Sequence, residues 1–424
     1  MKTTTARVLR SPTESVLARF LRYIAIDSRS AEDVDTVPST PAQWDIARLL
    51  VGELRDLGAQ DIRLSDTCVV YASIPANVDD PAAIPVIGLI AHMDTAPEVS
   101  GANVKAIIHA DYQGGDIVLP ADPTQVITVA ANPVLVDMIG DDIVTADGTT
   151  LLGSDDKAGI AAILTMVDTL RENPEIRHGT IAVAFTPDEE PGSGIDTFDI
   201  DGFGATFAYT VDGDGLGIIY DETWHARTAT VAFTGRNTHP GSAKGLLVNS
   251  VFALADFVSR LPTDMLPETT EGREGFVHPA RGSIEVERST LIVGLRDFES
   301  TGLDARERML RDIAAQTQDQ YPDVGIEITV EDFYSNIKDV LKDQPRLIDD
   351  AIEATKRAGL TPVVRPIRGG TDGAQLTFRG LPTPDLFNGG YNFHGKLEFN
   401  SRRGLEKTTE TLVCLVQLVV EKRE

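Results

Sequence analysis

The sequence predicts an α/β protein: a mostly parallel sheet with helices on both faces, into which a smaller α+β domain is inserted. Continuous apolar runs such as "PVIGLIAHMD" and "TIAVAFTPDEE" are typical of strands that are buried on both faces of a parallel sheet. After about residue 222, apolar and polar residues alternate instead, as they do in half-exposed strands. The length of 424 residues, of which 42% are hydrophobic, suits two such domains.

The elements expected in the larger domain follow in chain order. An amphipathic helix is expected in "PSTPAQWDIARLLVGELRDLGAQ", with Thr40 as its N-cap, Pro41 at its first position and Gly58 as its stop. A second helix, "DDKAGIAAILTMVDTLRENP", lies between the first two strands, and Pro174 ends it. The third strand is "ATFAYTVDGDG". After the inserted domain we expect a helix over 345–359, the Gly-rich segment "IRGGTDGAQL", the short strand "TPDLF" and a final helix.

The inserted domain is predicted over residues 222–333, so that the larger domain consists of 1–221 and 334–424. Its expected strands lie in "HARTATVAFTG", "GSIEVERSTLIVGLRDF" and "VGIEITVEDF". Its expected helices lie in "GLLVNSVFALADFVSRLP" and "LDARERMLRDIAAQTQDQYP". The order strand, helix, strand, strand, helix, strand is that of a ferredoxin-like unit.

The charge of the chain limits its partners. It has 65 acidic and 38 basic residues, and the formal net charge of -27 would repel nucleic acid and anionic membrane surfaces. Cys68 and Cys414 are too few and too far apart for a disulfide framework or a thiolate metal site. No segment offers the ~18 consecutive apolar residues of a membrane span, and the N-terminus lacks a signal-peptide run. We therefore expect a cytoplasmic protein that binds neither nucleic acid nor membrane.

Acidic residues and histidines follow the expected strands of the larger domain. They are His92 and Asp94 in "AHMDT", Asp155 and Asp156 in "GSDDKAG", Glu189 and Glu190 in "PDEE", Asp212 in "VDGDG", and His394 in "YNFHGK". Open α/β sheets bind ligands at the carboxyl ends of their strands, so these side chains are expected to face one crevice. Like charges concentrated in this way would repel one another without a cation between them.

This set of side chains predicts a metal site. Two histidines and several carboxylates without a thiolate suit zinc, manganese or cobalt, and two ions that share one carboxylate would neutralise the cluster. Such a pair of ions activates water for the hydrolysis of a carbonyl compound. The motifs HExxH, GxxxxGK[ST], GxSxG and CxxC do not occur in the chain, which removes several other classes of enzyme.

Eight motifs together resemble one family. In chain order they are "AHMDT", "TLLGSDDKAGIA", "AFTPDEE", "YTVDGDG", "GRNTHPGSAKG", "LRDF", "IRGGTDGAQL" and "GGYNFHGK". The resemblance as a whole runs from about residue 40 to the C-terminus. They resemble the peptidase T family of aminotripeptidases, within the co-catalytic zinc exopeptidases. The resemblance implies a zinc exopeptidase-like fold in which the inserted domain is a lid and the larger domain is catalytic. It also implies a cytoplasmic metallo-aminopeptidase that releases the N-terminal residue from tripeptides. A homodimer through the lid domain is compatible with it.

The resemblance implies two zinc ions per chain, with manganese or cobalt as substitutes. By position in the matched motifs, His92, Asp155 and Asp212 would hold one ion. Asp155, Glu190 and His394 would hold the other, so that Asp155 bridges the two.

The resemblance also implies roles for residues that hold no metal. Asp94 would orient the imidazole of His92, and Glu189 would be the general base that takes a proton from water. His239 in "NTHPG" would donate a hydrogen bond to the developing oxyanion, unless it only caps the turn before Pro240. The implied substrate-binding residues are Asn249, Arg296 and Arg368, although arginines in such places often pair with local acids.

Other functions fit the same residues. A dipeptidase, carboxypeptidase or N-acyl amino-acid deacylase of the same clan could use the same metals. A peptide-binding paralogue without activity is the alternative from another class, and the presence of Asp94, Glu189 and all five ligands speaks against it. Two residues depart from the family pattern: Pro191 could shift the neighbouring ligand, and Asp214 could be an alternative ligand.

Overall fold

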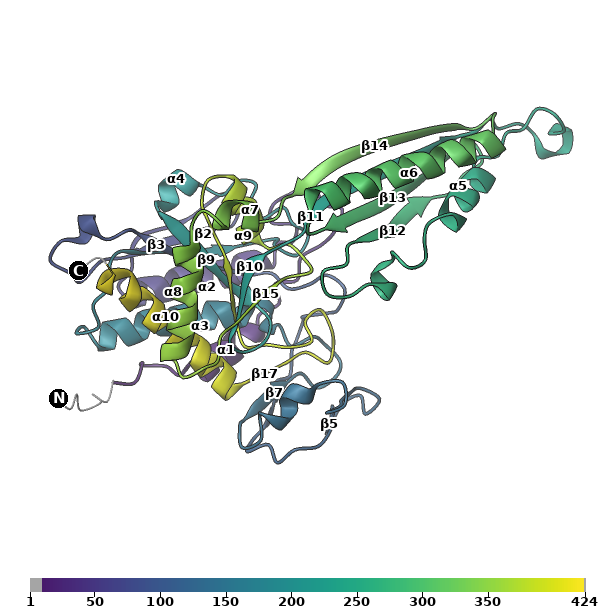
Figure 1. The fold of residues 1–424 in the computed structure, drawn as a ribbon. Helices are drawn as coiled ribbons and strands as arrows, with labels where there is room; N and C mark the ends of the chain where they lie inside the picture. Colours follow the sequence, from purple (N-terminus) through teal and green to yellow (C-terminus); the bar gives the residue numbers. More distant parts are fainter. Residues whose placement is uncertain (1–9, 423–424) are drawn as a thin grey trace. The chain divides into compact units, whose positions relative to one another are not determined.

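The computed structural model describes residues 10–422, which form two compact units. The first unit takes in the chain up to Asp221, Val340–Arg365 and the chain from Thr371 onward, and the second takes in Glu222–Asp339 and Pro366–Gly370. Each unit has a sheet of its own (Figure 1). The assignment of a catalytic domain and a lid domain to these parts of the chain stays a prediction. No helix in the described range is long and apolar enough to cross a membrane.

The first unit is built on an eight-stranded mixed sheet. From one edge to the other its strands are β1 (Gln60–Leu64), β2 (Val70–Ile74), β8 (Ile181–Thr186), β3 (Ile87–His92), β9 (Phe207–Gly213), β16 (Asp385–Phe387), β10 (Ile218–Glu222) and β15 (Val363–Pro366). The neighbours β8, β3, β9 and β16 run parallel, whereas the pairs β1–β2, β2–β8 and β10–β16 are antiparallel. The predicted α/β class, with three continuous apolar runs as central strands, is confirmed.

Helices cover both faces of this sheet. They are α1 (Val16–Ile24), α2 (Gln43–Asp56), α3 (Ser154–Glu172), α4 (Ile200–Phe203), α8 (Pro345–Arg357), α9 (Asp372–Phe378) and α10 (Arg402–Glu421). The short helix α7 (Lys338–Leu341) spans the boundary between the two units in the sequence. Helix α3 lies against β3 and β9, and α1 and α10 pack on it, which explains why α3 is buried almost throughout. On the other face, Phe203 of α4 and Leu376 of α9 pack against Ile90 and Ala184 of the sheet. Strand side chains point to the two faces in turn, so strands such as β3 and β8, which are buried at every position, give the sheet two apolar faces.

The first predicted helix starts later than expected. Helix α2 begins at Gln43 with Ala42 as its N-cap, and no side chain caps it. The prediction that Thr40 is the cap is wrong, because the Thr40 hydroxyl donates to the carbonyl oxygen of Arg29 at 2.7 Å. Gly58, with a φ of 84°, follows the end of the helix as predicted.

Four short strands between β3 and α3, together with one strand near the C-terminus, form a part of the first unit that was not predicted. A three-stranded sheet is made by β17 (Phe399–Ser401), β7 (Ile143–Thr145) and β4 (Ile107–His109), and β5 (Ile117–Val118) pairs with β6 (Val126–Ile127). Runs of two or three residues are too short to show a period. This part stabilises the turn before β17, because the Tyr391 ring stacks on the Phe399 ring at 5.0 Å.

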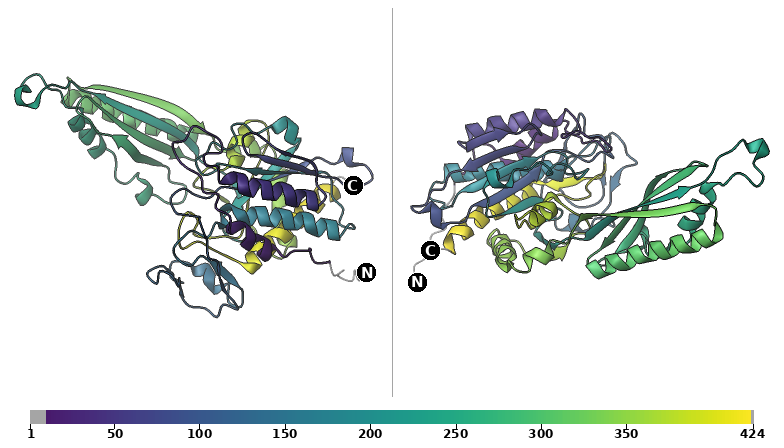
Figure 2. Two further views of the ribbon diagram at one scale, coloured as in Figure 1. Left: turned by 180° about the vertical axis from the view of Figure 1, so that it is seen from behind. Right: turned by 90° about the horizontal axis from the view of Figure 1, so that it is seen from above.

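The second unit has the predicted order of elements. It consists of β11 (His225–Thr234), α5 (Ser250–Ser259), β12 (Phe276–Ser283), β13 (Arg288–Asp297), α6 (Ser300–Gln320) and β14 (Gly325–Tyr334). The antiparallel sheet has the order β12-β13-β11-β14, and α5 and α6 share one core with it. Figure 2 shows the ribbon of this unit, coloured teal to green, from two further sides. One strand was placed wrongly: β12 begins at Phe276, and most of "GSIEVER" is the turn to β13, in which Ile284 is exposed.

Candidate metal centre

The carboxyl ends of neighbouring strands bring the predicted residues of the first unit together. Strand β3 ends at His92, and Asp212 is the second-last residue of β9. Glu189 and Glu190 follow the end of β8. Because β8, β3 and β9 are parallel neighbours, their carboxyl ends meet at the same edge of the sheet. The turn that carries His394 follows β16, which is the next strand in the sheet.

Asp155 lies between the two histidines. Its Oδ1 is 2.8 Å from His92 Nε2, and its Oδ2 is 3.3 Å from His394 Nε2. His92 Nε2 is also 3.4 Å from Asp212 Oδ1, and His394 Nε2 is 2.9 Å from Glu190 Oε2. All five predicted ligands are therefore neighbours, and one carboxylate presents one oxygen to each half of the cluster.

The donor atoms suit divalent cations. Two overlapping groups among the described residues, His92 with Asp156 and Asp212, and His92 with Asp155 and Glu190, have ligand atoms within 4.8 Å of one another. The buried oxygens Glu190 Oε1, Asp212 Oδ1 and Asp156 Oδ2 accept no hydrogen bond from the described residues. A buried carboxylate oxygen without a partner is costly, and a cation would satisfy it. Imidazole and carboxylate together fit zinc, manganese or cobalt.

Protons and cations compete for this cluster. Burial and the Asp155 charge raise the pKa of Glu190 to about 8. Burial opposes protonation of His92, but the charge of Asp212 and a hydrogen bond to Asp155 outweigh it and raise its pKa well above the usual value. Hydrogen bonds to Asp155 and Glu190 raise the pKa of His394 to about 11. A histidine binds a metal only without its extra proton, so cation binding at this cluster releases protons.

Asp94 joins the end of β3 to the turn after β8. Its Oδ1 lies 3.2 Å from His92 Nδ1, within ion-pair range, although the geometry is not that of an aligned hydrogen bond. The same carboxylate accepts the backbone N–H of Glu189 at 3.0 Å and that of Glu190 at 3.3 Å. One fully buried side chain therefore contacts a predicted ligand and the main chain of both glutamates.

The start of α3 depends on Glu398, to which the sequence analysis assigned no role. Glu398 is buried, and its carboxylate accepts the N–H groups of Leu152 at 2.8 Å, Gly153 at 2.7 Å and Asp155 at 3.0 Å. It thus caps a helix whose N-cap residue, Gly153, has no side chain. An acid between Leu397 and Phe399 is the one local signal that could have drawn attention to it.

The second turn of α3 comes unusually close to β9. A Cβ atom on Gly159 would lie 2.2 Å from the carbonyl oxygen of Val211, which only glycine avoids. Asp156 accepts the N–H of Gly159 at 3.1 Å and the side-chain amide of Asn388 at 3.0 Å. This close approach brings Asp155 and Asp156 near Asp212. Asp156 is a further candidate ligand, because it shares a group with His92 and Asp212.

The two residues that depart from the family pattern differ in their surroundings. Asp214 accepts a hydrogen bond from Arg365 Nη2 at 2.8 Å and another from the Tyr220 hydroxyl. It belongs to neither candidate ligand group of the described residues, so the expectation that it is an alternative ligand finds no support. Pro191 does not prevent Glu190 from lying next to His394.

His239 and Asn249 belong to the second unit. The N–H of Gly241 donates to His239 Nδ1 at 3.1 Å, so the turn-capping role is present. Because Nδ1 accepts, the neutral imidazole carries its proton on Nε2, which remains a donor. Asn249 is the N-cap of α5: its Oδ1 accepts the N–H of Val251 at 3.0 Å.

Arg296 and Arg368 also have partners within the second unit. Arg296 Nη1 donates to the carbonyl oxygen of the preceding residue, Leu295, at 2.9 Å. The Arg296 guanidinium lies 5.6 Å from the centroid of the Tyr334 ring. Arg368 donates to the carbonyl oxygens of Gly272 at 2.9 Å and Glu274 at 3.1 Å. Both guanidinium groups are therefore already held by main-chain carbonyls.

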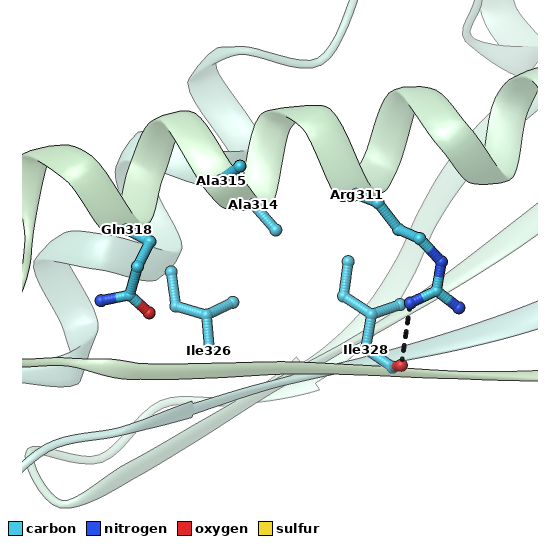
Figure 3. Close-up of a pocket in the computed structure, with 6 residues that line it drawn as sticks. All are labelled: Arg311, Ala314, Ala315, Gln318, Ile326 and Ile328. Carbon is cyan, nitrogen blue, oxygen red and sulfur yellow. Dashed lines mark hydrogen bonds between the residues drawn. The ribbon is translucent and has the colours of Figure 1, made fainter.

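A pocket in the second unit is separate from all of these residues. It lies between α6 and β14, has a volume of about 280 Å³, and is lined by Arg311, Ala314, Ala315, Gln318, Ile326 and Ile328 (Figure 3). Its lining includes no acid, no histidine and none of the predicted site residues. It is not a candidate for the catalytic site.

A family model and several relatives match most of this chain. The family model "Peptidase family M20/M25/M40" matches residues 146–418. Peptidase T of Desulfitobacterium hafniense (strain Y51) is 46% identical over 408 residues, which are 96% of this chain and 99% of that relative. Peptidase T of Clostridium perfringens is 43% identical over 409 residues, which are 96% of this chain and 100% of that relative.

Solved structures share the fold. An aminopeptidase from Bacillus cereus has a TM-score of 0.72, and a tripeptidase from Staphylococcus aureus has a TM-score of 0.74. Each is 22% identical to this chain, and each match covers 96% of this chain and 98% of the other. The predicted zinc exopeptidase-like fold and the predicted class of hydrolase are confirmed. The chain belongs to peptidase family M20/M25/M40 and, within it, to the peptidase T family.

Proposed function

We propose that the chain is a tripeptide aminopeptidase that uses two divalent metal ions. The observation that carries this proposal is the position of Asp155, with one carboxylate oxygen next to His92 and the other next to His394. A carboxylate so placed suits two cations side by side, which is the arrangement that hydrolytic dinuclear sites use. Membership of the peptidase T family supports a peptidase, and the similar structure from Staphylococcus aureus, which is that of a tripeptidase, supports tripeptides as substrates.

His92, Asp155 and Asp212 would hold one ion, and Asp155, Glu190 and His394 the other. Zinc is the proposed metal, with manganese or cobalt as substitutes, because the donors are imidazole and carboxylate. When bound, such ions polarise a carbonyl group and lower the pKa of water.

The remaining predicted residues would move protons and hold the substrate. Glu189 would accept a proton from the attacking water and deliver it to the leaving amine. Burial and the Asp212 charge raise the pKa of Glu189 well above its usual value, which is the direction that a carboxylate base needs near neutral pH. His239 Nε2 would donate to the oxyanion. Asn249, Arg296 and Arg368 would bind the peptide beyond the scissile bond.

The test of this function is a digest of free and N-acetylated di-, tri- and tetrapeptides, with and without a chelator. We expect free tripeptides to lose their N-terminal residue, N-acetylated ones to stay intact, and the chelator to stop the reaction until zinc or manganese is added. Cleavage of the acetylated peptides would favour the deacylase or carboxypeptidase alternatives. Undiminished cleavage in chelator would refute the metal mechanism.

The cytoplasmic location and a homodimer through the second unit are also part of the proposal. Leu246, at 55% exposure, and Phe252, at 62%, are exposed large apolar side chains of that unit, and a partner would cover such side chains. Sedimentation of the wild-type chain and of Phe252→Glu would test the dimer.

Replacement of His239 by Ala is expected to lower kcat by roughly 10²–10³-fold, because an oxyanion donor is lost. The metal content should not change. Steady-state kinetics and metal analysis check both, and His278→Ala, at an exposed position of β12, is the matched control. A wild-type rate in His239→Ala would leave the histidine with its turn-capping role alone. Activity that returns on mixing with chains inactive at the metal site would show that His239 acts across a dimer.

A further inference from the structure

The turn that carries both glutamates begins with a strained residue. Asp188 is buried and has a φ of 47°, in the left-handed region that residues other than glycine seldom adopt. It immediately precedes Glu189 and Glu190, so its backbone conformation sets the direction in which the next two side chains leave the chain. A residue in this conformation persists only when its surroundings hold it there.

Gln43, the first residue of α2, holds Asp188 at two points. Gln43 is fully buried, and its Nε2 donates to Asp188 Oδ1 at 2.6 Å. Its Oε1 accepts the backbone N–H of Asp188 at 3.1 Å. Ser39 adds two donors, because its N–H donates to Asp188 Oδ2 at 2.6 Å and its hydroxyl donates to Oδ1. One amide side chain therefore fixes the main chain and the side chain of the same residue.

The contacts extend through the whole turn. The successive N–H groups of residues 188, 189 and 190 donate to Gln43 Oε1, Asp94 Oδ1 and Asp94 Oδ2. The carbonyl oxygen of Asp188 accepts the N–H groups of Ser193 at 3.1 Å and Gly194 at 3.0 Å. The backbone of the turn is thus fixed on every side, by a carboxylate from β3 and by an amide from α2.

We infer that Gln43 and Asp188 are positioning residues, which hold the turn so that Glu190 meets His394 while Glu189 points elsewhere. The inference rests on the proposed roles of Glu189 as base and Glu190 as ligand, and it adds a requirement that those roles do not contain. The alternative is that this pair only attaches α2 to β8. The alternative predicts a loss of stability without a change in metal affinity.

A reciprocal exchange tests the pair. Gln43→Glu places a second carboxylate against Asp188 and removes a donor. Asp188→Asn turns an NH₂ group toward Gln43 and Ser39, which offer donors. In the double variant Asp188→Asn/Gln43→Glu, the new amide can donate to the new carboxylate, and Ser39 N–H still finds an oxygen. The second metal ion is the one that Asp155, Glu190 and His394 would hold. We expect each single variant to bind this ion roughly 10–100-fold more weakly, and the double variant to recover most of the lost affinity.

The measurements are zinc affinity and stoichiometry by titration without substrate, kcat and KM, and the thermal unfolding midpoint. Leu50→Ala is the matched control, since Leu50 is a fully buried aliphatic side chain of the same helix. It should lower the midpoint and leave both zinc ions in place. Should Gln43→Glu not fold, Gln43→Met replaces it, because it removes the amide without adding a charge.

Four outcomes are possible. Weaker binding of the second ion in the single variants, with recovery in the double variant, supports the inference. Single variants that unfold at a lower temperature but bind both zinc ions as tightly as Leu50→Ala does overturn it. A double variant that binds zinc no more tightly than the single variants also overturns it. If the wild-type chain binds no second ion or does not cleave peptides, the proposed function itself is wrong, and this result is distinct from a failure of the pair.

Discussion

Replacement of Glu189 by Gln should lower kcat by roughly 10²–10⁴-fold and leave both metal ions bound. The amide has the size and shape of the carboxylate but cannot accept a proton from water. Among the described residues, Glu189 belongs to neither candidate ligand group, whereas Glu190 does. Zinc content and kcat, measured on the same preparation, are the readouts.

Glu190→Gln is the matched comparison. The Glu190 carboxylate has one oxygen next to His394 and a second that is buried without a hydrogen-bond partner among the described residues. An amide is a poorer ligand for a dication, so this variant should lose one ion and regain part of its activity at high zinc or manganese. If metal rescues Glu189→Gln instead, or if the two variants behave alike, the division of labour between these neighbours is wrong.

Asp155→Asn should remove both ions and reduce peptide cleavage to background. Asp155 is the residue that contacts both histidines, and its two oxygens face different ones. An asparagine offers an oxygen to one side and an NH₂ group to the other, and it brings no charge to offset either cation. Metal content after dialysis, together with the digest of a free tripeptide, measures the effect.

Asp212→Asn provides the contrast, because Asp212 contacts His92 but belongs to only one half of the cluster. This variant should retain the ion held by Glu190 and His394. Retention of one ion in Asp155→Asn would show that Asp155 serves a single ion and does not bridge.

The sequence predicted those elements whose evidence lies within a few neighbouring residues. Strands β3, β8 and β9 are continuous apolar runs, and α3 has apolar residues at helical spacing, so both types of element follow from local pattern. The five ligands were predicted because their motifs resemble a family. Local pattern gave the wrong start for α2, because the Thr40 hydroxyl donates a hydrogen bond to the carbonyl oxygen of Arg29 and does not cap the helix.

Residues that act over long separations could not be predicted. Glu398 accepts the N–H of Leu152, which is 246 residues away in the sequence. Gln43 and Asp188 are 145 residues apart, and each looks like an ordinary polar residue in its own neighbourhood. No periodicity or spacing records such pairs, because they depend on which strands become neighbours in the folded sheet.

The dependence of α3 on Glu398 has a consequence for biosynthesis. His92, Asp155, Glu190 and Asp212 leave the ribosome early, whereas His394 and Glu398 lie shortly before α10, the helix that ends the described chain. A nascent chain that stops after β16 has four of the five predicted ligands but lacks Glu398, whose carboxylate caps the first turn of α3. In such a chain the N–H of Asp155 has lost the acceptor that Glu398 provides. The proposed pair of ions can therefore be held only after the segment that carries His394 and Glu398 has been translated.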